Sequence, residues 1–196
     1  MPPKTRWLLT ALTIGLVVDQ VSKAWTRTLD LRTGEVVLIP GWLSLVHAQN
    51  KGAAFSMLAD SPYRLPFFAV FTVVTVVALF LVWRATEPED RWTGLAIGLF
   101  LVGALGNAID RTWQGYVTDM VKVAAGAHGP EWWRALHLEL VGSPIYPIWN
   151  VADAAIVCAV PLYLFTTVFK RDAPPSAADE DPADATAADP LESNAP

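Results

Sequence analysis

The stretch that decides the fold is Gly103–Met120, with the sequence GALGNAIDRTWQGYVTDM. It ends an apolar run with a stripe of small residues and then places four polar residues close together: Asn107, Asp110, Arg111 and Asp119. A second cluster, Asn150–Asp153, opens the last apolar run and repeats the same Asn-x-x-Asp spacing. Carboxylates at the edge of a membrane span are costly to hold there, which makes them functional candidates. The sequence therefore predicts that the rest of the chain brings these two clusters together.

The composition indicates a membrane protein. The chain has 196 residues, of which 53% are hydrophobic and 17% charged, whereas soluble domains carry about 25% charged residues. The net charge of −5 arises in residues 172–196, which hold seven acidic residues and no basic one. The remaining body is slightly basic, so the total charge predicts no nucleic-acid partner. The single Cys158 excludes a Cys-based zinc site, and we expect it to be a small core residue.

Four apolar segments are candidates for membrane-spanning helices: Trp7–Thr28, Leu65–Trp83, Trp92–Asn107 and Ile148–Phe169. A hydrocarbon core of ~30 Å requires ~20 helical residues. The second and fourth segments reach this length, and the third does if its helix continues to about Arg111. The first has only twelve residues from Trp7 before Asp19. It must therefore carry Asp19 and Lys23 toward the far interface, or fail to span.

Basic residues in the short flanks predict the orientation. They fall at three ends that four spans place on one side: Lys4 and Arg6, Arg84 and Arg91, and Lys170 and Arg171. Such flanks face the cytoplasm, so we expect both termini inside the cell. We divide the chain into a membrane domain, residues 1–171, and an acidic tail, residues 172–196, which has too few apolar residues to fold and should be disordered in the cytoplasm.

The segments between spans carry small structural elements. Glu35–Ile39 and Leu43–Ala48 are β-favouring runs around a Pro-Gly turn, which predicts a small extracytoplasmic hairpin or cradle. Gly52 belongs to a run of small residues, Asn50–Phe55, that either allows close backbone approach to a ligand or forms a turn into an interfacial helix. In the second outer segment, Trp132 and its neighbour Trp133 predict a piece lying on the membrane surface.

Antiparallel spans would bring the two polar clusters to the same depth. Two carboxylates in a dry site share a proton, so that one acts as a base toward water and the other donates to a carbonyl, as in aspartic proteases. The spacing leaves open whether Asp110 or Asp119 partners Asp153. The three histidines, His47, His128 and His137, lack metal-ligand spacing, so we expect neither metal nor cofactor.

Two other functions compete with a protease. In a proton- or ion-coupled carrier, Asp19, Asp110 and Asp153 would relay ions, which predicts polar residues at several depths. In a membrane scaffold, the Asn and Asp residues would only join helices.

Five motifs in order resemble those of bacterial lipoprotein signal peptidase, or signal peptidase II: Asp19–Lys23, Asn50–Phe55, Gly103–Arg111, Gly115–Met120 and Trp149–Asp153. The resemblance covers roughly Trp7 to Phe169. It implies an intramembrane aspartic endopeptidase of the bacterial inner membrane that acts near the outer leaflet. Its substrate would be a prolipoprotein, cut before a diacylglyceryl-modified cysteine, and its partners would be membrane lipid and globomycin-type inhibitors.

The resemblance assigns roles to individual residues. It places the catalytic pair at Asp119 and Asp153 and substrate binding at Asn50 and Arg111, beside Gly52. Asn107 and Asn150 each precede an Asp by three residues on the same helical face, and we expect them to hydrogen-bond either the catalytic pair or the peptide backbone. Asp19 and Lys23 would form a structural pair at i and i+4. For Asp110 we favour a structural role with Arg111 over the alternative, a direct part in catalysis.

Some features of the sequence depart from the family pattern or go beyond it. Trp149 and Thr118 stand where the family usually has Phe and Val, and residues 122–146 form a longer stretch than is usual. Because Asp153 would lie in the first turns of a helix, whose dipole favours a negative charge, we expect the resting proton mainly on Asp119.

Overall fold

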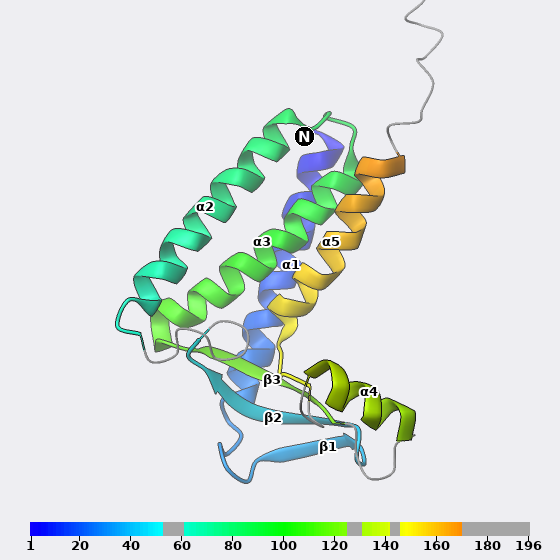
Figure 1. The fold of residues 1–196 in the computed structure, drawn as a ribbon. Helices are drawn as coiled ribbons and strands as arrows, with labels where there is room; N and C mark the ends of the chain where they lie inside the picture. Colours follow the sequence, from blue (N-terminus) through cyan, green and yellow to red (C-terminus); the bar gives the residue numbers. More distant parts are fainter. Residues whose placement is uncertain (53–60, 125–130, 142–145, 170–196) are drawn as a thin grey trace, which may run out of the picture.

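The computed structural model describes residues 1–52, 61–124, 131–141 and 146–169, and it combines a helical bundle with a small sheet at one end (Figure 1). Its elements in chain order are α1 (Pro3–Thr26), β1 (Glu35–Ile39), β2 (Leu43–Asn50), α2 (Arg64–Ala85), α3 (Arg91–Gln114), β3 (Val117–Val123), α4 (Glu131–Val141) and α5 (Val151–Phe169). The prediction of a mainly helical chain with a small β element is confirmed for these residues.

Helix α3 is the centre of the bundle and packs against α1, α2 and α5. Glycines permit these close approaches: a Cβ at Gly98 would lie 2.7 Å from the backbone oxygen of Leu8, and one at Gly103 would lie 2.1 Å from Ile156. A Cβ at Gly106 would lie 2.5 Å from the Asp19 carboxylate. The stripe of small residues on α3 therefore faces the neighbouring helices.

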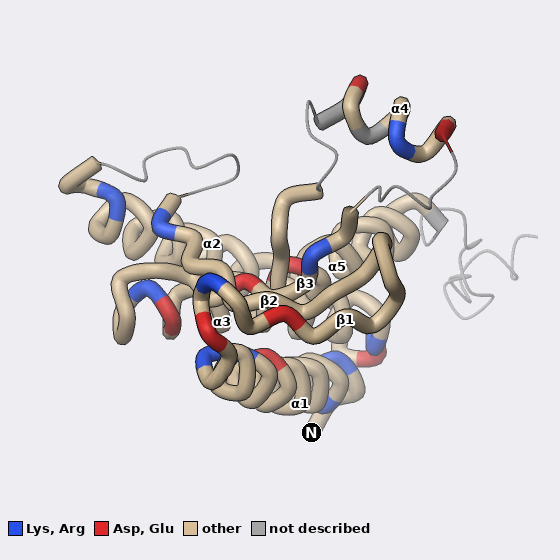
Figure 2. The backbone as a smooth tube through the Cα atoms, turned by 90° about the horizontal axis from the view of Figure 1, so that it is seen from below, with Lys and Arg blue, Asp and Glu red and all other residues tan. Residues whose placement is uncertain are grey.

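Three helices in the described residues are long and apolar enough to cross a membrane: α2, α3 and α5. Helix α1 is also long, at 24 residues, and its apolar side chains Ile14, Val17 and Val21 are each more than half exposed. It carries two charged residues that are fully buried, Asp19 and Lys23. Figure 2, which shows the molecule from the sheet end, shows α1 along one side of the sheet, with charged residues at several positions of the helix.

The sheet has three antiparallel strands in the order β1-β2-β3. The predicted hairpin is confirmed, with Gly41 in its turn at φ 76°. Strand β3 is absent from the sequence prediction. It begins after Gly115, which ends α3 in the left-handed conformation at φ 77°, and it pairs with β2 so that Asp119 lies opposite Ala48.

Cys158 and the segment around Trp132 were also expected at particular places in the fold. Cys158 is exposed on α5 rather than part of the core, because the side of a membrane helix that faces lipid is as apolar as its packed side. The expected surface piece around Trp132 is the helix α4, beside the sheet (Figure 1). The acidic tail and residues 53–55 of the Asn50–Phe55 motif lie outside the described residues.

Candidate active site

Asn150 lies immediately before α5 and is fully buried. The chain reaches it through Trp149, whose backbone pairs with β3: the Val121 N–H donates to the Trp149 carbonyl at 2.8 Å, and the Trp149 N–H donates to the Val121 carbonyl at 3.2 Å. This bridge joins the start of α5 to β3. As a result, the two candidate carboxylates are attached to elements that are held together.

Asp119 lies on β3 and is 3% exposed. Asn150 Nδ2 donates to its Oδ1 at 2.7 Å, and Asn50 Nδ2 donates to its Oδ2 at 3.1 Å. Burial raises the pKa of Asp119 to about 6, and the nearby charge of Asp153 acts in the same direction, while the two amide donors oppose the rise. Asp119 is therefore a carboxyl group able to hold a proton in mildly acidic conditions.

Asp153 lies in the first turn of α5 and is partly buried. Asn107 Nδ2 donates to its Oδ1 at 2.8 Å, and the backbone N–H of Asn150 donates to its Oδ2 at 3.3 Å. The Asp153 N–H donates in turn to Asn150 Oδ1 at 3.1 Å. Asn150 thus contacts both Asp119 and Asp153, and the structure brings these two carboxylates into one hydrogen-bond network.

Asp19 and Lys23 form the predicted i, i+4 ion pair, with 3.0 Å between Asp19 Oδ2 and Lys23 Nζ and both side chains fully buried. Asp19 Oδ1 also accepts a hydrogen bond from the backbone N–H of Ala152 at 2.9 Å. That N–H belongs to the first turn of α5, where backbone donors lack intrahelical partners. Asp19 therefore fixes the helix start that carries Asp153.

Asp110 lies on the side of α3 that faces α1 and is fully buried. It forms ion pairs with Lys23, at 3.6 Å, and Arg27, at 3.4 Å, rather than with the expected Arg111. Adjacent residues on a helix point about 100° apart, so Asp110 and Arg111 face different neighbours. Asp110 Oδ2 also accepts from the backbone N–H of Thr118 at 2.8 Å, which fixes the beginning of β3 next to Asp119.

Arg111 faces α2 and the β2 end of the sheet. Its Nη2 donates to the Gly52 carbonyl at 3.2 Å, and its guanidinium lies 4.0 Å from the centroid of the Phe68 ring, a distance suited to a cation–π contact. Its charge is attracted to the carboxylates of Asp153 and Asp119. The Gly52 N–H donates to Asn50 Oδ1 at 3.1 Å, which links Arg111 to the amide that contacts Asp119.

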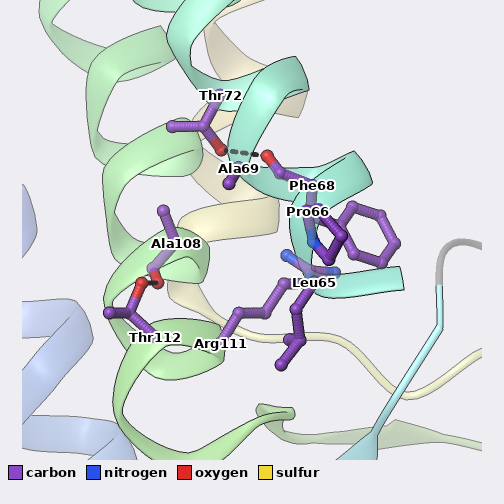
Figure 3. A pocket seen from close by; sticks show the side chains of 8 residues that line it. All are labelled: Leu65, Pro66, Phe68, Ala69, Thr72, Ala108, Arg111 and Thr112. Carbon is purple, nitrogen blue, oxygen red and sulfur yellow. Dashed lines mark hydrogen bonds between the residues drawn. The ribbon is translucent and has the colours of Figure 1, made fainter. Parts of the chain in front are cut away.

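A pocket of about 290 Å³ opens between α2 and α3 (Figure 3). It is mostly apolar and is lined by Leu65, Pro66, Phe68, Ala69, Thr72, Ala108, Arg111 and Thr112. Neither candidate catalytic carboxylate lines it, so it lies beside the reacting groups rather than around them. Arg111 connects the two regions, because it lines the pocket and contacts Gly52.

Sequence reasoning missed several of these contacts. Phe68 carries no local signal, because its role depends on α2 packing against α3. The contact between Lys23 Nζ and Asn107 Oδ1, at 3.0 Å, joins residues 84 positions apart.

Among the described residues, no three His, Cys, Asp or Glu side chains gather in a way that could hold a metal ion. The His47 side chain instead lies near the backbone, with its Nδ1 at 3.2 Å from the Leu29 carbonyl.

Comparison with known proteins gives a consistent picture. A family model described as signal peptidase (SPase) II matches residues 11–169. A lipoprotein signal peptidase from Geobacter metallireducens is 34% identical over 163 residues, which cover 83% of this chain and 90% of the relative. One from Streptococcus pyogenes serotype M1 is 36% identical over 163 residues, which cover 82% of this chain and 92% of the relative.

Solved structures share the fold. A protein described as a bacterial membrane enzyme superimposes with a TM-score of 0.67 at 24% identity, covering 84% of this chain and 89% of the other. A second structure with the same description gives a TM-score of 0.66 at 24% identity.

Proposed function

Because this chain belongs to the signal peptidase II family, we propose that it removes signal peptides from lipoprotein precursors by cutting before a diacylglyceryl-modified cysteine. The family consists of proteases, and its relatives here bear the name lipoprotein signal peptidase. The observation that carries the proposal is the contact of Asn150 with both Asp119 and Asp153, which supports a two-carboxylate site.

The proposed reaction is a direct attack of water on the scissile carbonyl. One carboxylate of the pair takes a proton from the water while the other, protonated, donates to the carbonyl oxygen, giving a tetrahedral intermediate. When this intermediate collapses, the C–N bond breaks, the leaving amine takes the proton from the carboxyl that served as the base, and a hydroxyl of the intermediate returns its proton to the other carboxylate. The dyad then returns to its single-proton state.

We assign the resting proton mainly to Asp119 and the base toward water to Asp153. The raised pKa of Asp119, about 6 because of burial, supports this assignment. So does the position of Asp153 in the first turn of α5, where the helix dipole favours a negative charge. Because the two groups titrate jointly, the assignment concerns populations of one shared proton. A neutron or vibrational measurement that located the proton on Asp153 in the free enzyme would overturn it.

Substrate binding is assigned to the groups around the dyad. Asn50, Gly52 and Arg111 would hold the peptide backbone near Asp119, since their amide and guanidinium groups connect the end of β2 to the dyad. The mostly apolar pocket beside Arg111 (Figure 3) suits part of the lipid or signal peptide. We also expect inhibition by globomycin-type compounds, because the chain belongs to the signal peptidase II family.

The proposed membrane arrangement has four spans, with α1 as the fourth, both termini in the cytoplasm and the sheet on the outer side. The exposed apolar side chains of α1 support its role as a span. Helix α4 would lie at the outer membrane surface, since it lies beside the sheet at that end (Figure 1) and exposes Trp132 and Leu138.

One observation weighs against an ion-coupled carrier. Between Thr93 and Asp110, the buried residues of α3 are all small or apolar: Gly94, Ala96, Ile97, Gly98, Val102, Gly103 and Gly106. A relay path along this central helix would need polar groups at several depths. The buried charged residue of this helix, Asp110, lies at the sheet end instead.

The test is cleavage by the purified protein of a diacylglyceryl-modified precursor peptide, with the unmodified peptide as the matched control. We expect a cut only in the modified peptide, a product that begins at the lipidated cysteine, and one ¹⁸O atom in the new carboxyl group when the reaction runs in H₂¹⁸O. Equal cleavage of both peptides would contradict the proposed substrate. The absence of any cleavage would contradict the proposed function.

A further inference from the structure

Lys23 is a fully buried cation whose ion pairs are with Asp19 and Asp110 and not with a carboxylate of the dyad. Its Nζ contacts Asp19 Oδ2 at 3.0 Å and Asn107 Oδ1 at 3.0 Å, and it also reaches the Gly106 carbonyl at 3.3 Å. If Lys23 contacted only Asp19, its role would be purely structural. Its contact with Asn107 indicates a second role, because Asn107 also donates a hydrogen bond to Asp153 of the dyad.

An ammonium group only donates hydrogen bonds. The atom of the Asn107 amide that faces Lys23 must therefore be the oxygen, and the NH₂ group must point the other way, where it donates to Asp153 Oδ1 at 2.8 Å. Asn150 Nδ2 also donates to Asn107 Oδ1, at 3.2 Å. Lys23 is the closer donor and the charged one, and charge-assisted hydrogen bonds are about twice as strong as neutral ones.

We propose that Lys23 is a positioning residue that acts on the dyad through Asn107, by fixing and polarising the Asn107 amide so that its N–H faces the Asp153 carboxylate. Without Lys23 the amide is free to turn its oxygen toward Asp153, which repels the charged form of that carboxylate. Chains of hydrogen bonds also polarise one another, so the ammonium strengthens the N–H donor that Asp153 receives. The inference rests on the proposed dyad function.

The other charged groups around this network come from two elements, α1 and α3. Asp19 on α1 and Asp110 on α3 face Lys23 directly, and Arg27 on α1 pairs with Asp110. Arg111 on α3 is attracted to the dyad from the other side. Lys23 is distinguished from Arg27 and Arg111 by donating to an asparagine that contacts the dyad.

The test is a double-mutant cycle on the pH dependence of kcat/KM. Lys23→Met should move the acid limb of the profile upward by about 0.5–1 pH unit, because the dyad's charged form loses a donor. The same change in an Asn107→Leu background should move the limb by less than a third as much, since the relay is already broken. An equal shift in both backgrounds would show a direct effect of charge and overturn the proposal, as would no shift at all.

Arg27→Met is the matched control, because it removes a cation from the same helix, paired with the same Asp110, but without an asparagine contact to the dyad. It should leave the limb in place, and a shift as large as that of Lys23→Met would contradict the relay. Isotope-edited infrared titration of ¹³C-carboxyl aspartate, with the Asp153→Asn spectrum subtracted, reads the titration of the Asp153 carboxylate in variants too slow to assay.

Removing Lys23 leaves Asp19 without its ion partner, so Lys23→Met is also made together with Asp19→Asn. If neither form folds, Lys23 serves the bundle alone and the proposal is wrong. Failure of the proposed function itself is distinct, because then the wild-type protein would not cleave the lipidated peptide.

Discussion

Asp119 is a carboxyl group whose proton affinity depends on folding. Burial raises its pKa to about 6 in the folded protein, from an ordinary value of 3.8. The folded state therefore holds this proton more tightly than the unfolded chain does. The stability that protonation contributes is fully present below pH ~4 and is lost as the pH rises through about 6.

The pH dependence of stability gives the first prediction. At about 1.4 kcal/mol per pKa unit, Asp119 should lower the stability of the wild type by about 1–3 kcal/mol between pH ~4 and pH ~7, and Asp119→Asn should remove this part of the pH dependence. Unfolding of both proteins in detergent across that range measures it. Parallel pH profiles for the two proteins would contradict the buried, proton-holding role.

Asp110 gives the second prediction at the scale of single residues. Its buried ion pairs with Lys23 and Arg27 make Asp110→Asn costly, by about 3–5 kcal/mol for a buried pair that loses one charge. Because the Asn oxygen can still accept from the Thr118 N–H, catalysis at low temperature should stay within about tenfold of the wild type. An unchanged melting temperature together with lost cleavage would instead place Asp110 in the reaction.

The contact between α1 and α3 depends on glycine. A Cβ at Gly98 would lie 2.7 Å from the Leu8 backbone oxygen and 2.8 Å from the Ala11 Cβ, and a backbone atom cannot turn aside. Gly98→Leu should therefore force the helices apart and destabilise the protein by more than the ~1–3 kcal/mol typical of overpacking. Val74→Ile on α2 is the control, since Val74 is 60% exposed and should change the melting temperature little. A Gly98→Leu protein as stable as this control would refute the packing.

The sequence predicted the elements whose signals are local. The hairpin β1–β2 follows from a Pro-Gly turn between β-favouring runs, and α2 and α5 follow from long apolar stretches. Strand β3 was missed because its partner β2 lies about 70 positions earlier (Asp119 faces Ala48). Its first four residues are also all buried, so it lacks the alternation of apolar and polar residues that marks a half-exposed strand.

The contacts of the site also divide into those that local sequence predicts and those that depend on how the helices pack. Asp19 and Lys23 were predictable as a pair because helical spacing alone brings i and i+4 together. The partners of Asp110 and the Lys23–Asn107 contact were not, because they depend on which faces of α1 and α3 meet. Cys158 was misplaced for a related reason, since lipid and protein interior are both apolar.

The whole molecule is predicted to have both termini in the cytoplasm and the sheet outside. In a Cys158→Ala background, Val37→Cys on β1 should react with a membrane-impermeant maleimide in cells whose inner membrane is intact. Glu89→Cys, between α2 and α3, should react only after permeabilisation. Both positions are exposed, so accessibility to the reagent depends on the side of the membrane. The reverse labelling pattern would invert the topology.

The most direct test of the catalytic claim is cleavage of a diacylglyceryl-modified precursor peptide by the wild type, Asp119→Asn and Asp153→Asn, each shown to be folded by its melting temperature. Since positioned acid–base groups contribute about 10²–10⁴-fold each, we expect either substitution to reduce the rate by at least about 10³-fold while the peptide still binds. A variant that folds, binds and still cleaves at more than about a tenth of the wild-type rate would contradict the two-carboxylate site.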